Sequence, residues 1–145
     1  MRVKKRFEYL EHTADVYVAA YGSSLGEALE NAALATVEVM TDAEKVEPKT
    51  LETVELEARD EASLLYAWLE ELLIRFDAEG LLFSSFKVSS VEGTEGGFRL
   101  RAEIRGEAFD PARHPQRVGV KAVTYHLMEI VREPGGVTVK FVLDI

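Results

Sequence analysis

The chain has 145 residues, enough for one domain with its own hydrophobic core. Hydrophobic residues make up 47% of it, as in ordinary globular proteins, and 26 acidic against 17 basic residues give a net charge of −9. That charge repels nucleic-acid backbones and anionic membranes, which disfavours direct binding to either. The absence of cysteine excludes disulfide frameworks, zinc fingers and thiol nucleophiles. No apolar run has the length of a signal peptide or a membrane span, so we expect a cytoplasmic protein without membrane contact.

Two short strands and a helix are predicted in the first third of the chain. Residues 7–10 and 16–21 are rich in β-branched and aromatic residues, which favours strands. Ser24 and Glu27 have the spacing of a capping box, so a helix should begin there and continue to about Met40. Apolar residues in this helix recur every three or four positions, and its many alanines indicate close approach to a sheet.

The middle of the chain predicts a third strand and a second helix. Residues 53–58 alternate between apolar and acidic, as a half-buried strand does. Asp60 is the expected cap of the second helix, and Gly80 its expected stop. Between them lies the clearest helical stripe in the sequence, formed by Leu65, Trp68, Leu69, Leu72, Leu73 and Phe76.

From Leu81 onward the apolar period changes to two. Strands are predicted near 82–92, 97–109, 119–132 and 137–143, with hairpin turns at 96–97 and 134–136. Asp110 to Arg117 is predicted as a loop. The expected order is ββαβαββββ in a single domain spanning 1–145. This order favours an α+β fold, with two helices packed on one face of a mainly antiparallel, mixed β-sheet.

The turn between the first two strands holds a candidate site. His12, Thr13 and Asp15 interrupt two apolar runs, and loops on a rigid scaffold often carry function. Local hydrogen bonds that cap the turn would explain Thr13 and Asp15 equally well.

The end of the chain holds a second candidate site. The last strand runs into Asp144 and Ile145, and an apolar final residue indicates that this end is held in the fold. The Asp144 side chain and the Ile145 carboxylate repel each other unless solvent or a cation intervenes. If Asp15 lies nearby, three carboxylates converge, and oxygen ligands of this kind suit Ca²⁺ or Mg²⁺. The alternative is a solvated terminus with one more surface aspartate.

A third group of polar residues lies in and before the sixth strand. Alternation would place Lys121 and Tyr125 on one face and Thr124 and His126 on the other. A lysine within a strand needs an edge position or a carboxylate partner. A buried, hydrogen-bonded His126 is the simpler interpretation, and Asp110 and His114 in the preceding loop are further candidates.

Several catalytic classes lack their motifs. Neither Gly-x-x-x-x-Gly-Lys nor Gly-x-Gly-x-x-Gly occurs, and no Ser/His/Asp set has a familiar spacing. A stand-alone metal-dependent hydrolase built on the same carboxylates is therefore disfavoured, because no clear pair of nucleophile and base accompanies them.

These motifs together resemble the archease family. The matching stretches occur in order along the whole chain, and the His-Thr-Ala-Asp and Lys-Ala-x-Thr-Tyr-His motifs are specific. Gly119 departs from the pattern, which usually has a larger, often acidic residue there. The stretches are Phe7 to Val16, Ala20-Tyr21-Gly22 with the helix through Ala33, Leu65 to Phe76, Gly106 to Asp110 with His114, Lys121 to His126, and Leu143-Asp144-Ile145.

The resemblance implies an accessory protein rather than an enzyme. Archeases activate RtcB-type RNA ligases in tRNA splicing by promoting guanylylation of the ligase and multiple turnover. The resemblance also implies a divalent-metal site at Asp15, Asp144 and Ile145, with calcium as the expected cation and magnesium or manganese as alternatives. His12, Lys121, His126, Asp110 and His114 are the candidates for activation or for contact with the partner. We expect tRNA to be engaged through the ligase alone.

One other role and one open question accompany this interpretation. A chaperone-like modulator of a tRNA methyltransferase is the alternative that the resemblance implies. Such a protein would reduce aggregation of its client without needing Asp15. The sequence leaves open whether copies of the chain assemble with one another.

Overall fold

A computed structural model describes residues 5–11 and 15–145 of the chain. Its elements are β1 (Phe7–Leu10), β2 (Val16–Gly22), α1 (Leu25–Met40), the 3-10 helix η1 (Ala43–Lys45), β3 (Thr50–Ala58), α2 (Glu61–Glu79), β4 (Leu81–Thr94), β5 (Gly97–Ala108), β6 (Ala122–Glu133) and β7 (Gly136–Asp144). The predicted order of strands and helices and the α+β class are confirmed. The fold adds η1, which has too few residues to leave a periodic signal.

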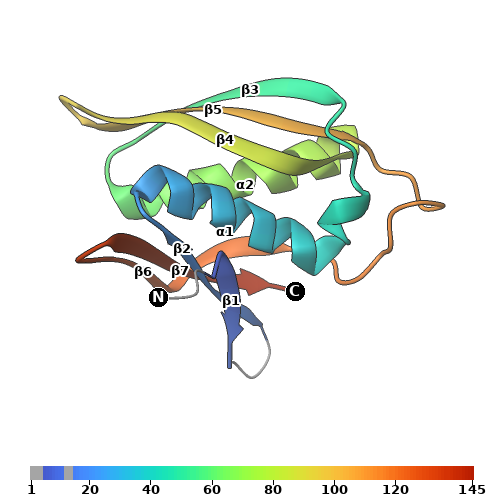
Figure 1. Cartoon of the computed structure of the whole chain (residues 1–145), viewed down its shortest axis with the longest axis horizontal. Coiled ribbons are helices and arrows are strands. Elements are labelled where there is room, and N and C mark those ends of the chain that lie inside the picture. The colour runs from blue at the N-terminus through green and yellow to red at the C-terminus, as the bar shows by residue number, and fades with distance from the viewer. Residues whose placement is uncertain (1–4, 12–14) are drawn as a thin grey trace.

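The strands form two sheets, where the sequence suggested one. A four-stranded sheet has the order β1-β2-β7-β6 and a three-stranded sheet has the order β3-β5-β4. Every strand pair among the described residues is antiparallel. Figure 1 shows α1 and α2 lying between the two sheets, so each helix is covered on two sides. Pairing between distant strands decides this arrangement, and sequence periodicity carries no information about such pairing.

Helix α1 is suited to a layer between two sheets. Four of its alanines, Ala28, Ala32, Ala33 and Ala35, are fully buried. Small side chains allow a sheet to approach closely on either side, so the alanine content predicted from sequence serves both sheets. At its start, the Ser24 hydroxyl accepts a hydrogen bond from the Glu27 amide, as predicted, while the Glu27 carboxylate binds the Ser23 amide.

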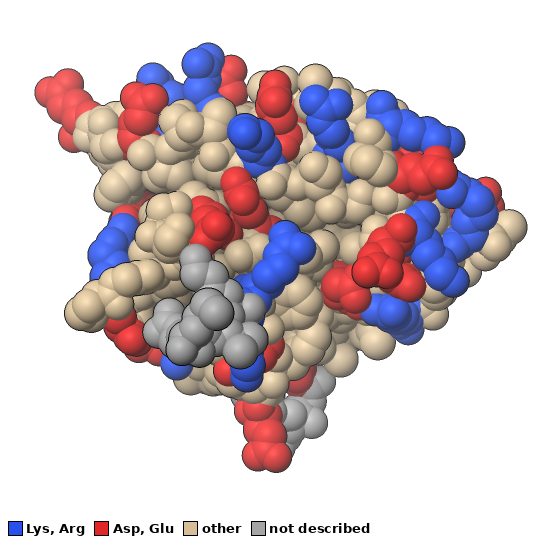
Figure 2. Space-filling model, viewed as in Figure 1, with Lys and Arg blue, Asp and Glu red and all other residues tan. Residues whose placement is uncertain are grey.

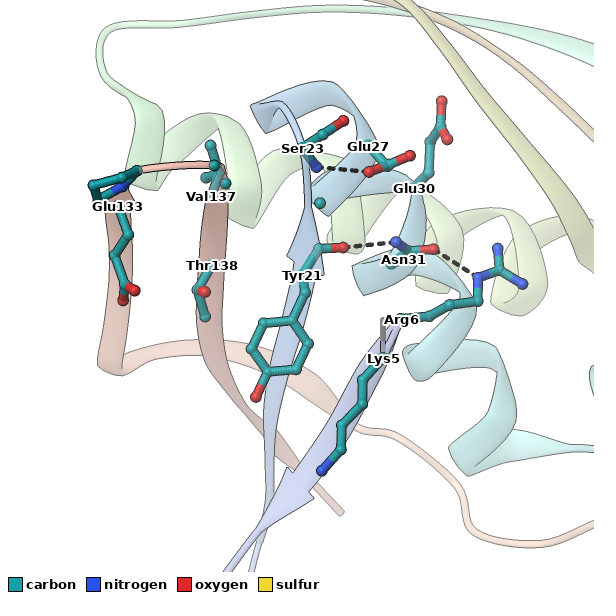
Figure 3. Close-up of a pocket in the computed structure, with 14 residues that line it drawn as sticks. Lys5, Arg6, Tyr21, Ser23, Glu27, Glu30, Asn31, Glu133, Val137 and Thr138 are labelled. Atoms are coloured by element: carbon teal, nitrogen blue, oxygen red, sulfur yellow. Dashed lines mark hydrogen bonds between the residues drawn. The ribbon is translucent and has the colours of Figure 1, made fainter. Parts of the chain in front are cut away.

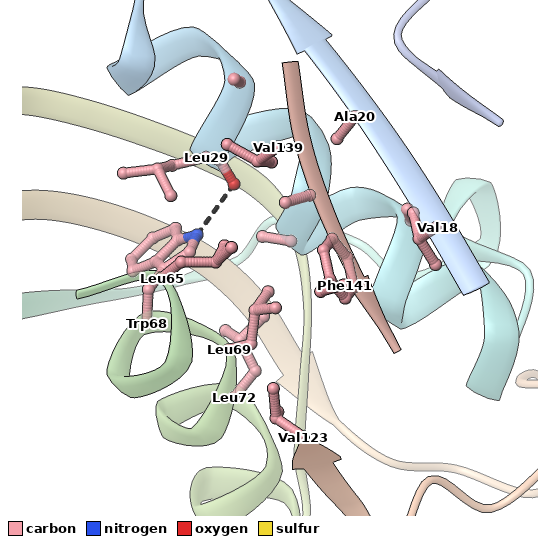
Figure 4. Packing of buried hydrophobic residues seen from close by; sticks show 14 of the residues in the cluster. Val18, Ala20, Leu29, Leu65, Trp68, Leu69, Leu72, Val123, Val139 and Phe141 are labelled. Atoms are coloured by element: carbon pink, nitrogen blue, oxygen red, sulfur yellow. Dashed lines mark hydrogen bonds between the residues drawn. The ribbon is translucent and has the colours of Figure 1, made fainter. Parts of the chain in front are cut away.

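Helix α2 supplies the largest side chain of the core. Trp68 is fully buried, and its indole N–H donates to the Leu29 carbonyl of α1 at 2.8 Å (Figure 4). That bond satisfies the one polar atom of the ring and fixes the spacing of the two helices. Asp60 caps the start of the helix, and Gly80 ends it in the left-handed conformation with φ 67°, both as predicted.

No helix within residues 5–11 and 15–145 is both long and apolar enough to cross a membrane.

Candidate functional site

Antiparallel pairing of β2 with β7 brings the two predicted aspartates to the same end of the four-stranded sheet. Val16, the first residue of β2, lies opposite Leu143, so Asp15 immediately precedes β2 at the end of the sheet where Asp144 lies. On the other side of β7, Ala122 of β6 lies opposite Asp144. Asp15 and Asp144 are both half-buried.

The terminal residue is held against the fold, as the sequence predicted. The Ile145 side chain packs against the hydrophobic core, and the residue before it is paired within the sheet. The Ile145 main chain therefore lies one residue beyond Asp144, at the same sheet end. We call Asp15, Asp144 and the Ile145 carboxylate the carboxylate tip.

The composition of the carboxylate tip fits a hard cation. Carboxylates that lie close together repel each other, and a divalent cation between them removes that repulsion. No Lys, Arg or His in residues 5–11 and 15–145 forms an ion pair with Asp15 or Asp144. Within the same residues, no three Asp, Glu, His or Cys side chains cluster as metal ligands. Among the described residues at this sheet end, the Ile145 carboxylate is the further oxygen ligand that the resemblance implied beside Asp15 and Asp144. His12 and Thr13 lie outside the described residues.

Lys121 lies beside the carboxylate tip through its backbone. Its amide donates to the Asp144 carbonyl at 2.7 Å, and its side chain is exposed, as predicted, rather than in the core. It precedes β6 instead of lying within it, because the strand begins at Ala122. Gly119 lies in open space, since a Cβ there would meet no heavy atom within 4 Å. A larger residue would therefore fit at this position.

His114 is separate from the carboxylate tip and fully paired. It is buried, its Nδ1 accepts from the Asp110 amide at 2.9 Å, and its Nε2 lies 2.8 Å from the Glu107 carboxylate. Because Nδ1 accepts, Nε2 carries the hydrogen and donates to Glu107, so the ring is neutral. The Asp110 carboxylate accepts from the Ala112 amide and pairs with Arg113. These contacts hold a turn in which His114 is buried, while the Asp110 side chain stays 47% exposed.

Glu107 is the centre of this network, and the sequence indicated it only as one member of the stretch Gly106 to Asp110. Its carboxylate accepts from the Glu47 amide at 2.8 Å and from His114, and it forms an ion pair with Arg113 at 2.5 Å. Burial raises the pKa of this carboxyl, but the contacts with Glu47, His114 and Arg113 together lower it by more than burial raises it. The resulting pKa is about 2. Glu107 is therefore ionised in the folded protein at neutral pH and joins the end of β5 to two loops.

His126 is exposed rather than buried in the sheet, which differs from the simpler interpretation of the sequence. A bulge interrupts the pairing of β6 with β7 between Thr124 and Glu129, so the alternation predicted for residues 121–126 holds only as far as Thr124. Tyr125, next to His126, is 55% exposed and stacks on Tyr66 of α2, with ring centroids 4.4 Å apart. The bulge thus turns three consecutive side chains of an edge strand toward solvent.

A cavity of about 450 Å³ lies at the opposite end of the four-stranded sheet (Figure 3). Asn31 lies at its wall, donates to the Tyr21 carbonyl at 2.7 Å and accepts from Arg6 Nε at 2.9 Å. The wall carries two cationic residues, Lys5 and Arg6, and three acidic ones, Glu27, Glu30 and Glu133. The cavity was not predicted from the sequence, although Asn31, a polar residue within the apolar helix α1, was a detectable signal.

Comparison with known sequences decides the family. The sequence profile of the Archease protein family (MTH1598/TM1083) matches residues 7–145. Protein archease of Sulfurisphaera tokodaii is 46% identical over 141 residues, which are 97% of this chain and 99% of the relative. The chain belongs to the Archease family. Protein archease of Pyrococcus abyssi is 48% identical over 132 residues, 91% of this chain and 92% of the relative.

Solved structures agree with this archease assignment. The solution structure of protein 1598 of Methanobacterium thermoautotrophicum is 44% identical, covers 97% of this chain and 99% of its own, and has a TM-score of 0.85. A crystal structure from Thermotoga maritima, described as an archease and "possible chaperone", covers 100% of this chain and 99% of its own at 18% identity, with a TM-score of 0.59. The second likeness shows the archease fold alone.

Proposed function

We propose that this archease is an accessory protein of an RtcB-type RNA ligase, promoting guanylylation and multiple turnover of the ligase in tRNA splicing. Family membership supports the role, and one structural observation supports its site: the β2–β7 pairing brings Asp15 and Asp144 to the same end of the sheet, beside Ile145. We propose that these carboxylates hold one divalent cation, with calcium first and magnesium or manganese as alternatives.

The chain's own residues have distinct parts in this proposal. Asp15, Asp144 and the Ile145 carboxylate would hold the cation, which would supply positive charge against the phosphates of the ligase-bound nucleotide. Besides the cation, the Lys121 ammonium group adds a positive charge at the same end of the sheet. Its side chain is exposed, so a partner can reach it. His114 has no part in this chemistry, because both ring nitrogens are engaged within the fold.

An accessory role without direct RNA binding agrees with the charge distribution. On the face shown in Figure 2, acidic and basic side chains are interspersed, without a continuous basic stripe among the described residues. On the outer side of the three-stranded sheet, Arg101 pairs with Glu55 and Arg99 with Glu57. RNA-binding surfaces need uncompensated positive charge, so we propose that tRNA contacts the ligase alone, in the cytoplasm.

Transfer of label from GTP to the ligase tests the proposal. The purified cognate ligase, stalled after one turnover, would be incubated with α-labelled GTP and manganese, with and without this chain. We expect wild type to restore labelling of the ligase and Asp144→Asn to restore at least about tenfold less. Glu103→Gln, an exposed carboxylate on β5, is the matched control and should act as wild type. Equal labelling by wild type and Asp144→Asn would contradict the role of the carboxylate tip.

A chaperone role is the second candidate, because the Thermotoga maritima protein of the same fold is described as a "possible chaperone". Its client would be a tRNA methyltransferase. Light scattering of a heated methyltransferase would test it, and a chaperone should suppress aggregation as well with Asp15→Ala as with wild type. Suppression by neither protein would remove this candidate.

A further inference from the structure

The side of the molecule formed by α2 and β6 combines features that fold stability does not explain. β6 is an edge strand at the opposite edge of its sheet from β1, and α2 packs against it. We call the exposed side of α2 together with the bulged segment 125–128 the α2–β6 flank. Its exposed apolar side chains are Ile74, Tyr125 and Leu127, which are 50%, 55% and 45% exposed.

Leu127 is in an unfavourable backbone conformation. Its φ of 58° is the one positive value at a non-glycine residue among the described residues. The left-handed region costs an ordinary L-residue roughly 1 kcal/mol, and glycine or asparagine adopts it more readily. A leucine that is both strained and 45% exposed gains little from burial to offset that cost. Strain of this kind is a reason to look for a function of the side chain.

The stacked tyrosines next to Leu127 present a preformed aromatic surface. The rings of Tyr66 and Tyr125 are 4.4 Å apart and inclined by 8°, so one covers the other while Tyr125 keeps more than half of its surface in solvent. Glu70 lies one helical turn from Tyr66 and adds negative charge at its side, which contributes to raising the Tyr66 pKa after the effect of burial. A rigid ring beside a carboxylate is a favourable contact for an arginine.

The α2–β6 flank also carries much of the negative charge of the chain. α2 and β6 together hold seven acidic and two basic residues. Both arginines are already paired, Arg75 with Glu52 and Glu71, and Arg132 with Glu61. Of the seven acidic residues, the five that remain form no ion pair within residues 5–11 and 15–145: Glu70, Asp77, Glu79, Glu129 and Glu133.

These features select one kind of occupant. A second copy of the chain would bring equal negative charge to the same side and be repelled. An added β-strand is disfavoured, because the bulge removes the segment between Thr124 and Glu129 from regular pairing and bends the edge. RNA is excluded by charge. A protein surface with arginine or lysine around an apolar contact matches both the rings and the free carboxylates.

We propose that the α2–β6 flank is the surface that docks this archease on a positively charged face of its partner protein, with Tyr125 and Leu127 as the central contacts. The inference rests on the proposed function, in which that partner is the RNA ligase. β6 begins beside Asp144, so the flank starts next to the carboxylate tip and a partner held on it would reach both. Docking and activation are then separate tasks of neighbouring surfaces.

A matched pair of substitutions tests the docking surface. Leu127 and Leu51 are both 45% exposed, and Leu51 lies on β3, an edge strand of the other sheet. Asparagine tolerates positive φ, so Leu127→Asn should melt at the wild-type temperature or above. We expect Leu127→Asn to weaken binding to the purified ligase at least about tenfold by titration calorimetry, as loss of a central contact does. Leu51→Asn should bind within about twofold of wild type, since it lies outside the flank.

Charge removal gives a second measurement on the same surface. Glu70→Gln and Glu129→Gln should slow association with the ligase and flatten its dependence on salt, because free carboxylates steer a basic partner. Leu127→Asn that binds as tightly as wild type would overturn the inference. Equal weakening by Leu51→Asn would overturn it as well, because the effect would not belong to the flank.

The carboxylate tip separates this inference from the proposed function. Asp144→Asn should bind the ligase as wild type does and fail to stimulate its labelling. If Leu127→Asn and wild type stimulate labelling of the ligase at the same half-saturating concentration, the proposed docking surface is wrong and the proposed function stands. A wild-type chain that neither binds nor stimulates the ligase would overturn both.

Discussion

Two groups of carboxylates in this protein have opposite surroundings. Glu107, at the end of β5, is contacted by the Glu47 amide, by His114 and by Arg113. At the carboxylate tip, Asp15 and Asp144 have no cationic side chain paired with them among the described residues. Glu107 therefore has its hydrogen-bonding and ionic partners within the fold, whereas the carboxylate tip has no positively charged partner among the described residues.

The contrast separates a structural role from a binding role. A buried carboxylate with all its partners in place stabilises the loops that supply those partners and has little capacity for a ligand. Carboxylates that lie side by side without a counter-charge weaken the fold slightly until a cation arrives. Four measurements test this distinction.

Removing the Glu107 carboxylate should have the largest effect on stability. Glu107→Leu leaves His114 Nε2 and the Glu47 amide without their acceptor, and we expect a loss of about 3 kcal/mol in the free energy of unfolding. Urea denaturation would measure it. Glu103→Gln, exposed on the same strand, should change stability by less than about 0.5 kcal/mol. A loss below 1 kcal/mol for Glu107→Leu would show that its network is not structural.

Calcium should stabilise the protein through the carboxylate tip. At a free concentration 100 times the Kd, binding to the folded state adds about 2.7 kcal/mol. For a domain of this size we expect a melting temperature higher by roughly 5–10 °C. Asp15→Ala should be folded without calcium and show no such rise. A rise of the same size in Asp15→Ala would place the cation elsewhere.

Acid should remove the contribution of Glu107. Its pKa is about 2 in the folded protein, below the ordinary value of 4.5, so the carboxylate stabilises the fold at any pH above about 4.5. That contribution is lost as the pH falls from about 4.5 to 2, because the unfolded chain takes up the proton first. Denaturation of wild type and Glu107→Gln across this range would measure it. A stability difference between them that stays constant down to pH 2 would contradict the assignment.

Lys121→Ala should have the smallest effect on stability and still affect function. The Lys121 side chain is exposed and its structural bond is made by the backbone, so we expect a change below about 0.5 kcal/mol. Ligase labelling should nevertheless fall, because the positive charge next to Asp144 is lost. A Lys121→Ala protein that unfolds easily but activates normally would reverse this assignment and make Lys121 a structural residue.

Local signals in the sequence predicted most of the elements. Gly80, Asp60 and Ser24 mark helix ends through backbone chemistry that needs no distant partner, and each lies where the sequence placed it. The division into two sheets was beyond reach, because it depends on β5 pairing with both β3 and β4 while β7 returns to β2. Such pairing joins segments far apart in the chain and leaves no periodic trace.

The candidate site shows the same limit. Asp15 and Asp144 could be named from sequence, but their location at the same end of the sheet follows from the β2–β7 register. The bulge in β6 did leave a signal in the sequence. The core-facing residue before the bulge, Val123, is odd-numbered, whereas the core-facing residues after it, Met128 and Ile130, are even-numbered. The alternation of apolar and polar residues is therefore displaced by one position, as a bulge requires. The stretch Gly106 to Asp110 and His114 were recognisable in the sequence, but the contact between Glu107 and His114 was not, since it forms between a strand end and an irregular loop.

The pairing of β2 with β7 has a consequence for biosynthesis. β1 and β2 can form a hairpin as soon as they leave the ribosome, but the other edge of β2 stays open until β7, near the opposite end of the sequence, has been translated. Closing so long a loop is entropically costly, which makes this step a candidate for the slowest in folding. Asp15 and Asp144 come together in that same step. Calcium binding during biosynthesis would therefore indicate that β7 has paired with β2.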